Sequence, residues 1–244
     1  MKREAQAAVL FLLGAAVLRA GFTDLYLRYV KAGLRPLLLA AGIVLIVAAI
    51  ATVWYELRRP RTAQENQSEP EHRDPGCHAH REPRISWLLV LPLFALILVA
   101  PPAPGSYSAM HAGTALQRPS DFPDLPAGDP LRLSVIDYAG RAAYGHGRSL
   151  DDRRIKITGF VALDRGGAPY LTRMVRSCCA ADAQPVKIGL SGQMPPALPA
   201  DSWIEVTGTY TGKRIKDPVN GGAIPFFKVG QAESVPAPRD PYEN

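Results

Sequence analysis

Two adjacent cysteines are the most chemically distinctive feature of this 244-residue sequence, and Cys178 and Cys179 are followed after two alanines by Asp182. Because side chains alternate between the two faces of a regular strand, at least one of these cysteines is expected at a turn or surface. Thiolates bind soft and borderline transition metals, and a nearby carboxylate can orient them or add a ligand. The segment therefore predicts a substrate or metal contact made by Cys178, Cys179 and Asp182.

Two other interpretations of the cysteine pair stay open on the sequence alone. The two sulfurs could form a vicinal disulfide, which an oxidising compartment permits, or both residues could simply fill space in the core. A catalytic thiol is less favoured. The only histidine within residues 131–244, His146, is far from the cysteines along the chain, and no general base is evident. Nucleophile-elbow and metal-hydrolase spacings are also missing from the sequence. We therefore expect that the protein is not an enzyme.

A second group of potential metal ligands lies earlier in the chain and comprises His72, Cys77, His78 and His80. Such side chains can fill three or four positions around zinc, copper(I) or nickel. Their spacing matches no closed structural site, and residues 57–84 have the Pro-, Gln-, Glu- and Arg-rich composition of a disordered linker. A weak metal contact and a plain solvated linker are thus both open. The cofactor is unknown from the sequence, with zinc or another transition metal as the leading expectation.

Three apolar runs within the first hundred residues predict membrane-spanning helices. The run at residues 36–54 is uncharged and close to the ~20 residues that a bilayer-spanning helix needs. The run at residues 5–18 is short unless it continues to residue 27, but no small-residue cleavage site follows it as in a signal peptide. The run at residues 85–100 stops at two prolines, which cannot continue a helix. We expect two spans within residues 1–56 and a third within residues 85–101.

The lysines and arginines of the short loops predict the orientation of these spans. The N-terminus and residues 57–84 together carry eight of them, against three between the first two apolar runs. By the positive-inside rule, the N-terminus and residues 57–84 face the cytoplasm. Three spans then place residues 102–244 outside the cell (inner) membrane, and the conclusion reverses if the first run does not span. We therefore expect a multi-pass membrane protein with an extracytoplasmic C-terminal domain.

Two charged residues, Arg19 and Asp24, lie in the extended form of the first span. Charged groups inside a membrane are costly and usually face a partner or a water-filled cavity, so one interpretation is contact with another membrane subunit. The other places both residues near the interface, where Arg19 reaches toward the headgroups and Asp24 pairs with Arg28 four residues later.

The C-terminal part of the chain has the pattern of a small barrel. Residues 102–130 are expected to be a linker, and residues 131–143 a single short helix. Strands are predicted at residues 153–163, 170–177, 184–190, 202–210 and 224–235, and glycines within two of them favour strongly curved strands that close on themselves. The fold class is thus an α+β membrane protein, with transmembrane helices followed by a small OB-like antiparallel β-barrel with one short helix over residues 131–244.

An OB-like barrel raises nucleic acid as a ligand, since such domains stack bases on aromatic side chains in a basic groove. Residues 130–244 hold 15 lysines and arginines against 11 acidic residues, which is a modest excess. The aromatic residues of the strands are more simply interpreted as core and strand-face residues: Phe160, Tyr170, Trp203, Tyr210, Phe226 and Phe227. We expect no nucleic-acid partner.

Several segments of the sequence carry a resemblance to a known family. They read TGFV at 158–161, SCCAADAQPV at 177–186, WIEVTGTY at 203–210, and FFKV followed by VPAPRDPYEN at the end of the chain. Together they resemble the DUF1980 family, with the same order of membrane helices, His-containing loop and β-domain. The resemblance implies a membrane subunit that works beside a separate multi-span permease in a two-component transport system.

We therefore expect a membrane-anchored accessory subunit, whose external domain binds or gates the substrate of the permease through its cysteine pair. A transition-metal ion is the substrate that this chemistry suggests. The expected partners are the lipid bilayer and the multi-span permease subunit. The alternatives are an envelope thiol redox protein, in which the pair cycles between dithiol and disulfide, and a structural assembly protein.

Overall fold

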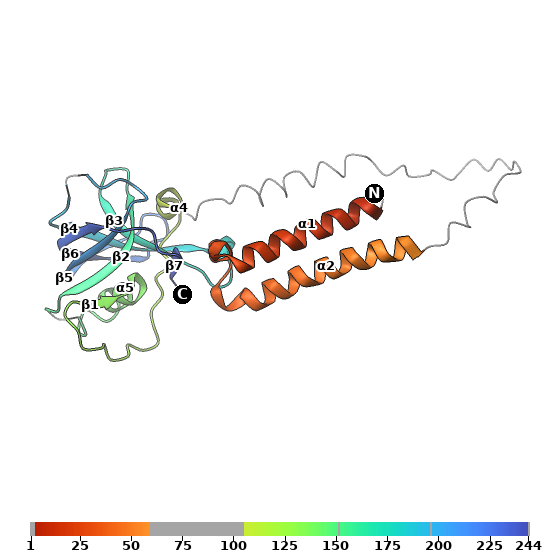
Figure 1. Cartoon of the computed structure of the whole chain (residues 1–244). Coiled ribbons are helices and arrows are strands. Elements are labelled where there is room, and N and C mark those ends of the chain that lie inside the picture. Colours follow the sequence, from red (N-terminus) through yellow and green to blue (C-terminus); the bar gives the residue numbers. More distant parts are fainter. Residues whose placement is uncertain (1–2, 59–104, 151, 196, 244) are drawn as a thin grey trace, which may run out of the picture. The chain divides into compact units, whose positions relative to one another are not determined.

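The structure is a computed structural model that describes residues 3–58, 105–150, 152–195 and 197–243 (Figure 1). The third apolar run at residues 85–100 lies outside the described residues. The same holds for His72, Cys77, His78 and His80, so these expectations stay predictions. The described residues divide into two compact units, one with residues 3–25 and 33–58 and the other with residues 26–32 and 105–243.

The first unit is a pair of apolar helices, α1 (Arg3–Phe22) and α2 (Arg35–Arg58). Their backbones approach closely at glycines, since a Cβ atom on Gly14 would lie 2.9 Å from the Gly42 carbonyl oxygen. A Cβ atom on Gly42 would likewise lie 2.8 Å from Leu18 Cδ2. Small residues of this kind allow tight van der Waals packing between membrane helices, where burial of apolar surface gives no driving force.

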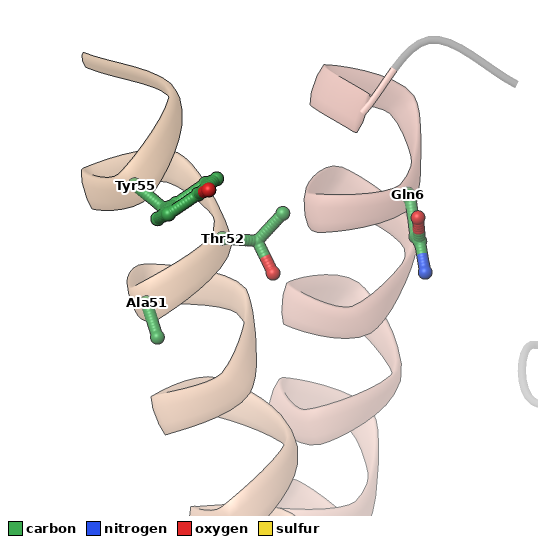
Figure 2. A pocket seen from close by; sticks show the side chains of 4 residues that line it. All are labelled: Gln6, Ala51, Thr52 and Tyr55. Atoms are coloured by element: carbon green, nitrogen blue, oxygen red, sulfur yellow. The ribbon is translucent and has the colours of Figure 1, made fainter. Parts of the chain in front are cut away.

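One described helix, Ala32–Arg58, is long and apolar enough to cross a membrane by its length and composition. The apolar part of α1, Gln6–Phe22, is shorter. Large apolar side chains of α2 such as Leu37 and Val44 are exposed in the isolated chain, as in a helix that contacts lipid or another protein. An open pocket between α1 and α2 is lined by Gln6, Ala51, Thr52 and Tyr55 (Figure 2).

The second unit is built on a closed five-stranded barrel, which confirms the predicted barrel. Its strands are β2 (Ile155–Leu163), β3 (Pro169–Val175), β4 (Gln184–Gly192), β5 (Trp203–Lys216) and β6 (Ala223–Ser234). They follow the order β2-β5-β6-β4-β3, and the pairing of β3 with β2 closes the barrel.

The prediction of a wholly antiparallel barrel is wrong in one respect, because β4 and β6 pair in parallel. The chain leaves β4 and crosses to form β5 beside β2, with which it pairs antiparallel. The connection after β5, residues 217–222, then returns the chain as β6, antiparallel to β5 and therefore running in the same direction as β4.

The single helix predicted for residues 131–143 is two elements. Leu131–Leu133 form a short strand, β1, parallel to β2, and α5 spans Val135–Ala143. The helix begins after Ser134, whose hydroxyl accepts a hydrogen bond from the Asp137 N–H at 3.0 Å. This N-cap satisfies a backbone donor of the first turn and fixes where the helix starts.

Two hydrophobic clusters fill the barrel unit. The larger one joins α5 to the strands through buried residues such as Tyr138, Leu171 and Phe227. The smaller one contains Phe160 and Tyr170, as expected of core aromatics, and also Ala109 of the short helix α4 (Ser106–His111). Residues 105–116, expected within a linker, thus pack as part of the barrel unit.

A buried ion pair fastens α4 to the barrel. Lys187 Nζ lies 2.9 Å from Asp217 Oδ2, and the two side chains are 1% and 0% exposed. Lys187 also donates to the Ala112 carbonyl oxygen, while the Asp217 carboxylate accepts from the Thr114 and Val219 N–H groups. The pair therefore ties the segment after α4 to the turn between β5 and β6.

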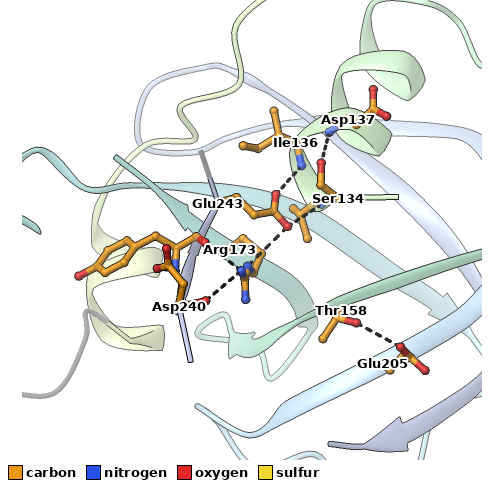
Figure 3. A network of polar contacts seen from close by, with 10 residues as sticks. Ser134, Ile136, Asp137, Thr158, Arg173, Glu205, Asp240 and Glu243 are labelled. Carbon is orange, nitrogen blue, oxygen red and sulfur yellow. Dashed lines mark hydrogen bonds and ion pairs between the residues drawn. The ribbon is translucent and has the colours of Figure 1, made fainter. Parts of the chain in front are cut away.

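The C-terminal tail is held by a second polar network (Figure 3). Its short strand β7 (Tyr242–Glu243) pairs in parallel with β3. The Glu243 carboxylate accepts from the Val135 and Ile136 N–H groups at 3.0 Å each and lies 3.5 Å from Arg173 Nε. Burial raises the pKa of Glu243, while these donors act in the opposite direction. The tail thus caps the N-terminus of α5 and holds it beside β3.

Candidate functional site

The predicted trio lies in one loop between β3 and β4, residues 176–183, which we call the cysteine loop. The Sγ atoms of Cys178 and Cys179 and a carboxylate oxygen of Asp182 all lie within 4.8 Å of one another. Cys178 is exposed, whereas Cys179 and Asp182 are half-buried. Both cysteines are free thiols. The structure therefore brings together the three side chains that the sequence singled out.

Asp182 organises the backbone of this loop. Its Oδ1 accepts from the Ser177 N–H at 3.0 Å, and its Oδ2 accepts from the Cys178 N–H at 2.9 Å. The hydrogen bonds from the Cys178 backbone and thiol, with further backbone donors, hold the pKa of Asp182 below its usual value. The carboxylate is thus charged at neutral pH. It joins the start of the loop to its end through the Ser177 and Cys178 N–H groups, as aspartates often do in turns.

The pKa of the Cys178 thiol is shifted upward, in the opposite direction to that of Asp182. Its hydrogen bond to the Asp182 carboxylate, followed by that to Cys179, raises the pKa of Cys178 to about 11. Burial and the nearby negative charges add to the same effect. Cys178 therefore carries its proton at neutral pH, and a metal ion that binds its sulfur must displace that proton.

Residues 26–32, which lie between the two apolar helices, form backbone hydrogen bonds with the cysteine loop. We call them the connecting segment. The Lys31 N–H donates to the Cys178 carbonyl oxygen at 3.0 Å, and the Ala180 N–H donates to the Tyr29 carbonyl oxygen at 2.8 Å. Val30 and Cys179 form the antiparallel bridge between these bonds. The cysteine loop is thus paired with a strand-like piece of chain far away in sequence.

Arg176 joins the cysteine loop to the connecting segment and the tail. Its fully buried side chain donates to the Leu27 carbonyl oxygen and to both carboxylate oxygens of Asp240, at 3.1 and 3.0 Å. Its guanidinium also lies over the ring of Tyr242, whose hydroxyl donates to the Arg28 carbonyl oxygen. Sequence reasoning missed this residue, although a charged side chain two residues before Cys178 was a visible signal.

The two charged residues of the extended first apolar run, Arg19 and Asp24, lie in different elements. Arg19 is exposed in the last turn of α1, which ends at Phe22. Asp24 lies beyond that end, in the exposed first position of the 3₁₀ helix η1 (Asp24–Arg28). The helix is thus shorter than the extended span, and contact of either residue with another subunit stays a prediction.

The chain matches one known family through its barrel. The family model of the DUF1980 C-terminal domain matches residues 142–243, which include all five barrel strands, the cysteine loop and the tail. This part of the protein is thus a DUF1980 C-terminal domain, and the resemblance to the DUF1980 family is confirmed. Neither the curated proteins nor the solved structures contain a match.

Replacing Asp182 by Asn is expected to make Cys178 more reactive. Without the carboxylate, the pKa of Cys178 should fall from about 11 toward its ordinary value. At pH 8 the thiolate fraction then rises by about 100-fold and its intrinsic nucleophilicity falls by about tenfold, so alkylation should be about tenfold faster. The rate can be measured with iodoacetamide and assigned to Cys178 by tandem mass spectrometry.

Asp164→Asn is a matched control for this experiment. Asp164 also closes a loop, because its Oδ1 accepts from the Gly166 and Ala168 N–H groups in the turn between β2 and β3. Its replacement loosens a turn without changing the surroundings of a cysteine. Equal alkylation rates of Cys178 in both variants and the wild type would contradict the proposed effect of the Asp182 charge.

Proposed function

We propose that this protein is a membrane-anchored accessory subunit of a two-component permease, whose cysteine loop binds a transition-metal ion such as zinc or copper(I). The observation that carries the proposal is the convergence of two thiols and one carboxylate within 4.8 Å in one loop. Sulfur and carboxylate donors suit zinc, and a site with three protein ligands leaves a fourth position for water or a partner. Such a site can take up and release its ion, as an accessory subunit requires.

The arrangement of the barrel unit supports two of the three proposed spans, those that follow residue 32. Residues 26–32 and 105–243 belong to one compact unit and so lie on one side of any membrane that the protein crosses. The apolar helix Ala32–Arg58 carries the chain from that side to the other. A further crossing is then needed before residue 105, and the apolar run at residues 85–100 can provide it.

The positive-inside rule, applied to the same segments, favours an external barrel. The closed five-stranded barrel with its crossover is consistent with an OB-like fold. We infer a separate permease partner from membership of the DUF1980 family and from the pair of helices, since so few helices form a poor transport pathway. The exposed apolar side chains of α2 are available for contact with lipid or with that partner.

A metal titration of the full chain in detergent tests the proposal. The Cys77→Ser background removes the cysteine outside the cysteine loop, and reductant keeps Cys178 and Cys179 as thiols. Competition with a chromophoric chelator should then show one zinc or copper(I) ion per chain. The ion should be lost when Cys178 and Cys179 are both changed to Ser.

Two controls separate the cysteine loop from other causes. Ser177→Ala keeps the backbone hydrogen bond to Asp182 and should keep the metal. Replacing His72, His78 and His80 together by Ala should also keep it, because the proposed site does not use them. Metal retained without the cysteine pair would overturn the proposal. No metal in this titration, together with a Cys178–Cys179 disulfide in protein purified without reductant, would instead support the redox or structural alternatives.

A further inference from the structure

The cysteine loop adjoins the first residue of the apolar helix. Its Cys178 carbonyl oxygen accepts from the Lys31 N–H, and the next residue, Ala32, begins the apolar segment Ala32–Arg58, which consists of a 3₁₀ turn (Ala32–Leu34) followed by α2. Consecutive Cα atoms are about 3.8 Å apart, so the residue paired with the loop directly precedes this apolar segment. This placement follows from contacts within the barrel unit and from chain continuity.

The second connection toward an apolar segment begins with Ser106, whose N–H donates to Asp201 Oδ1 before β5, and it continues to the start of β4. The Ala115 N–H donates to the carbonyl oxygen of Pro185, which lies three residues after Asp182. Ala109 of α4 packs in the smaller hydrophobic cluster, against which Ala180 and Ala183 of the cysteine loop also pack. The connecting segment therefore meets the barrel at the cysteine loop itself, and the second connection joins the hydrophobic cluster against which this loop packs.

The exposed side chains of these two pieces suit the surface of a membrane. Arg28 in the connecting segment is exposed and Lys31 is half-buried, and such cations interact with lipid phosphates. Tyr107 of α4 is 77% exposed, and tyrosine is enriched where a protein passes through the headgroup level. Cations thus lie on the connecting segment, which pairs with the cysteine loop, and an exposed aromatic side chain lies on the second connection.

We propose that the Cys178–Cys179–Asp182 site lies in the lipid headgroup layer of an anionic membrane, so that its metal ion is exchanged along the membrane surface. This inference rests on the proposed membrane anchoring. The negative surface potential draws cations into the same layer, which raises their concentration at the site. A permease in the same membrane could then receive the ion without its release into bulk solution.

Depth-dependent fluorescence quenching of the full chain tests this inference. Single cysteines are introduced after Cys77, Cys178 and Cys179 have been changed to Ser, and each is labelled with a small fluorophore. The protein is reconstituted into vesicles of phosphatidylcholine and phosphatidylglycerol that carry a nitroxide on the headgroup or deep on the acyl chain. A label at Ala181→Cys, in the exposed part of the cysteine loop, should be quenched by the headgroup nitroxide.

Arg165→Cys is the matched control within the barrel. It lies in the turn before β3, and the cysteine loop follows the other end of that seven-residue strand, about 20 Å away. Its label should escape the headgroup nitroxide. A second label on Cys178 itself, with only Cys77 and Cys179 changed to Ser, guards against a folding defect and should behave like the label at Ala181→Cys.

A third label, at Val47→Cys in α2, reports insertion through quenching by the acyl-chain nitroxide. If that label is quenched while both labels of the cysteine loop are not, the headgroup placement is wrong and the membrane anchor stands. If the Val47→Cys label escapes the acyl-chain nitroxide, the proposed anchoring itself is wrong and the placement falls with it.

Discussion

Replacing Lys187 by Met should lower the free energy of unfolding of the barrel by about 3 kcal/mol, the lower end of the cost of breaking a buried ion pair. Lys187 and Asp217 are both shielded from solvent. Methionine fills a similar volume but leaves the Asp217 carboxylate buried without its cation. Two backbone N–H groups, those of Thr114 and Val219, continue to donate to that carboxylate, which keeps the cost at the lower end. Urea unfolding of the full chain, followed by near-ultraviolet circular dichroism, measures the loss.

Lys156→Met is the matched control, because it removes a lysine from an ion pair that solvent reaches. Lys156 Nζ lies 2.6 Å from Glu205 Oε1, and these side chains are 21% and 17% exposed. Arg132 remains beside the same carboxylate after the change. The expected loss is below about 1 kcal/mol. Similar losses of unfolding free energy in the two variants would show that burial does not determine how much the Lys187–Asp217 pair contributes to stability.

The affinity of the cysteine loop for zinc should rise by about 100-fold between pH 6 and pH 8, because zinc binding must release the proton of the Cys178 thiol. The pKa of Cys178 is raised to about 11, so its thiol stays protonated across this range and each bound ion must release that proton. Tenfold per pH unit follows for one displaced proton. Asp182, whose pKa is lowered, is already ionised and adds nothing to the slope. Chelator competition at several pH values, in the Cys77→Ser background, measures the affinity.

A pH indicator in weak buffer gives an independent measurement of the same proton. Saturating zinc at pH 7 should release at least one proton per chain, and the Cys178→Ser variant should release one fewer at zinc saturation. A zinc affinity that stays constant from pH 6 to pH 8 would contradict coordination by the Cys178 sulfur.

The barrel strands were predictable because their pattern is local. Alternating apolar residues mark each strand, and the five predicted strands lie within a few residues of those found, although β5 extends to Lys216. The convergence of Cys178, Cys179 and Asp182 was predictable for the same reason, since a tight turn brings them together over five residues.

The elements that the sequence missed depend on contacts between distant residues. Leu131–Leu133 fit a helical period as well as a strand, and their pairing with β2 decides for the strand. The parallel pairing of β4 with β6 follows from the crossover rather than from either strand. The hydrogen bond from Arg176 to Leu27 joins two parts of the chain that no local pattern relates.

The bridge between Val30 and Cys179 is absent from a barrel that is produced without residues 26–32. A chain that begins at residue 105 lacks the connecting segment, so the Cys178 carbonyl oxygen and the Ala180 N–H lose their backbone partners. Unpaired backbone groups of this kind can pair with the backbone of another molecule, as the groups of an exposed strand edge do. We therefore expect the truncated chain to self-associate through this loop, and fusing residues 26–32 back onto it should keep it monomeric, as measured by light scattering.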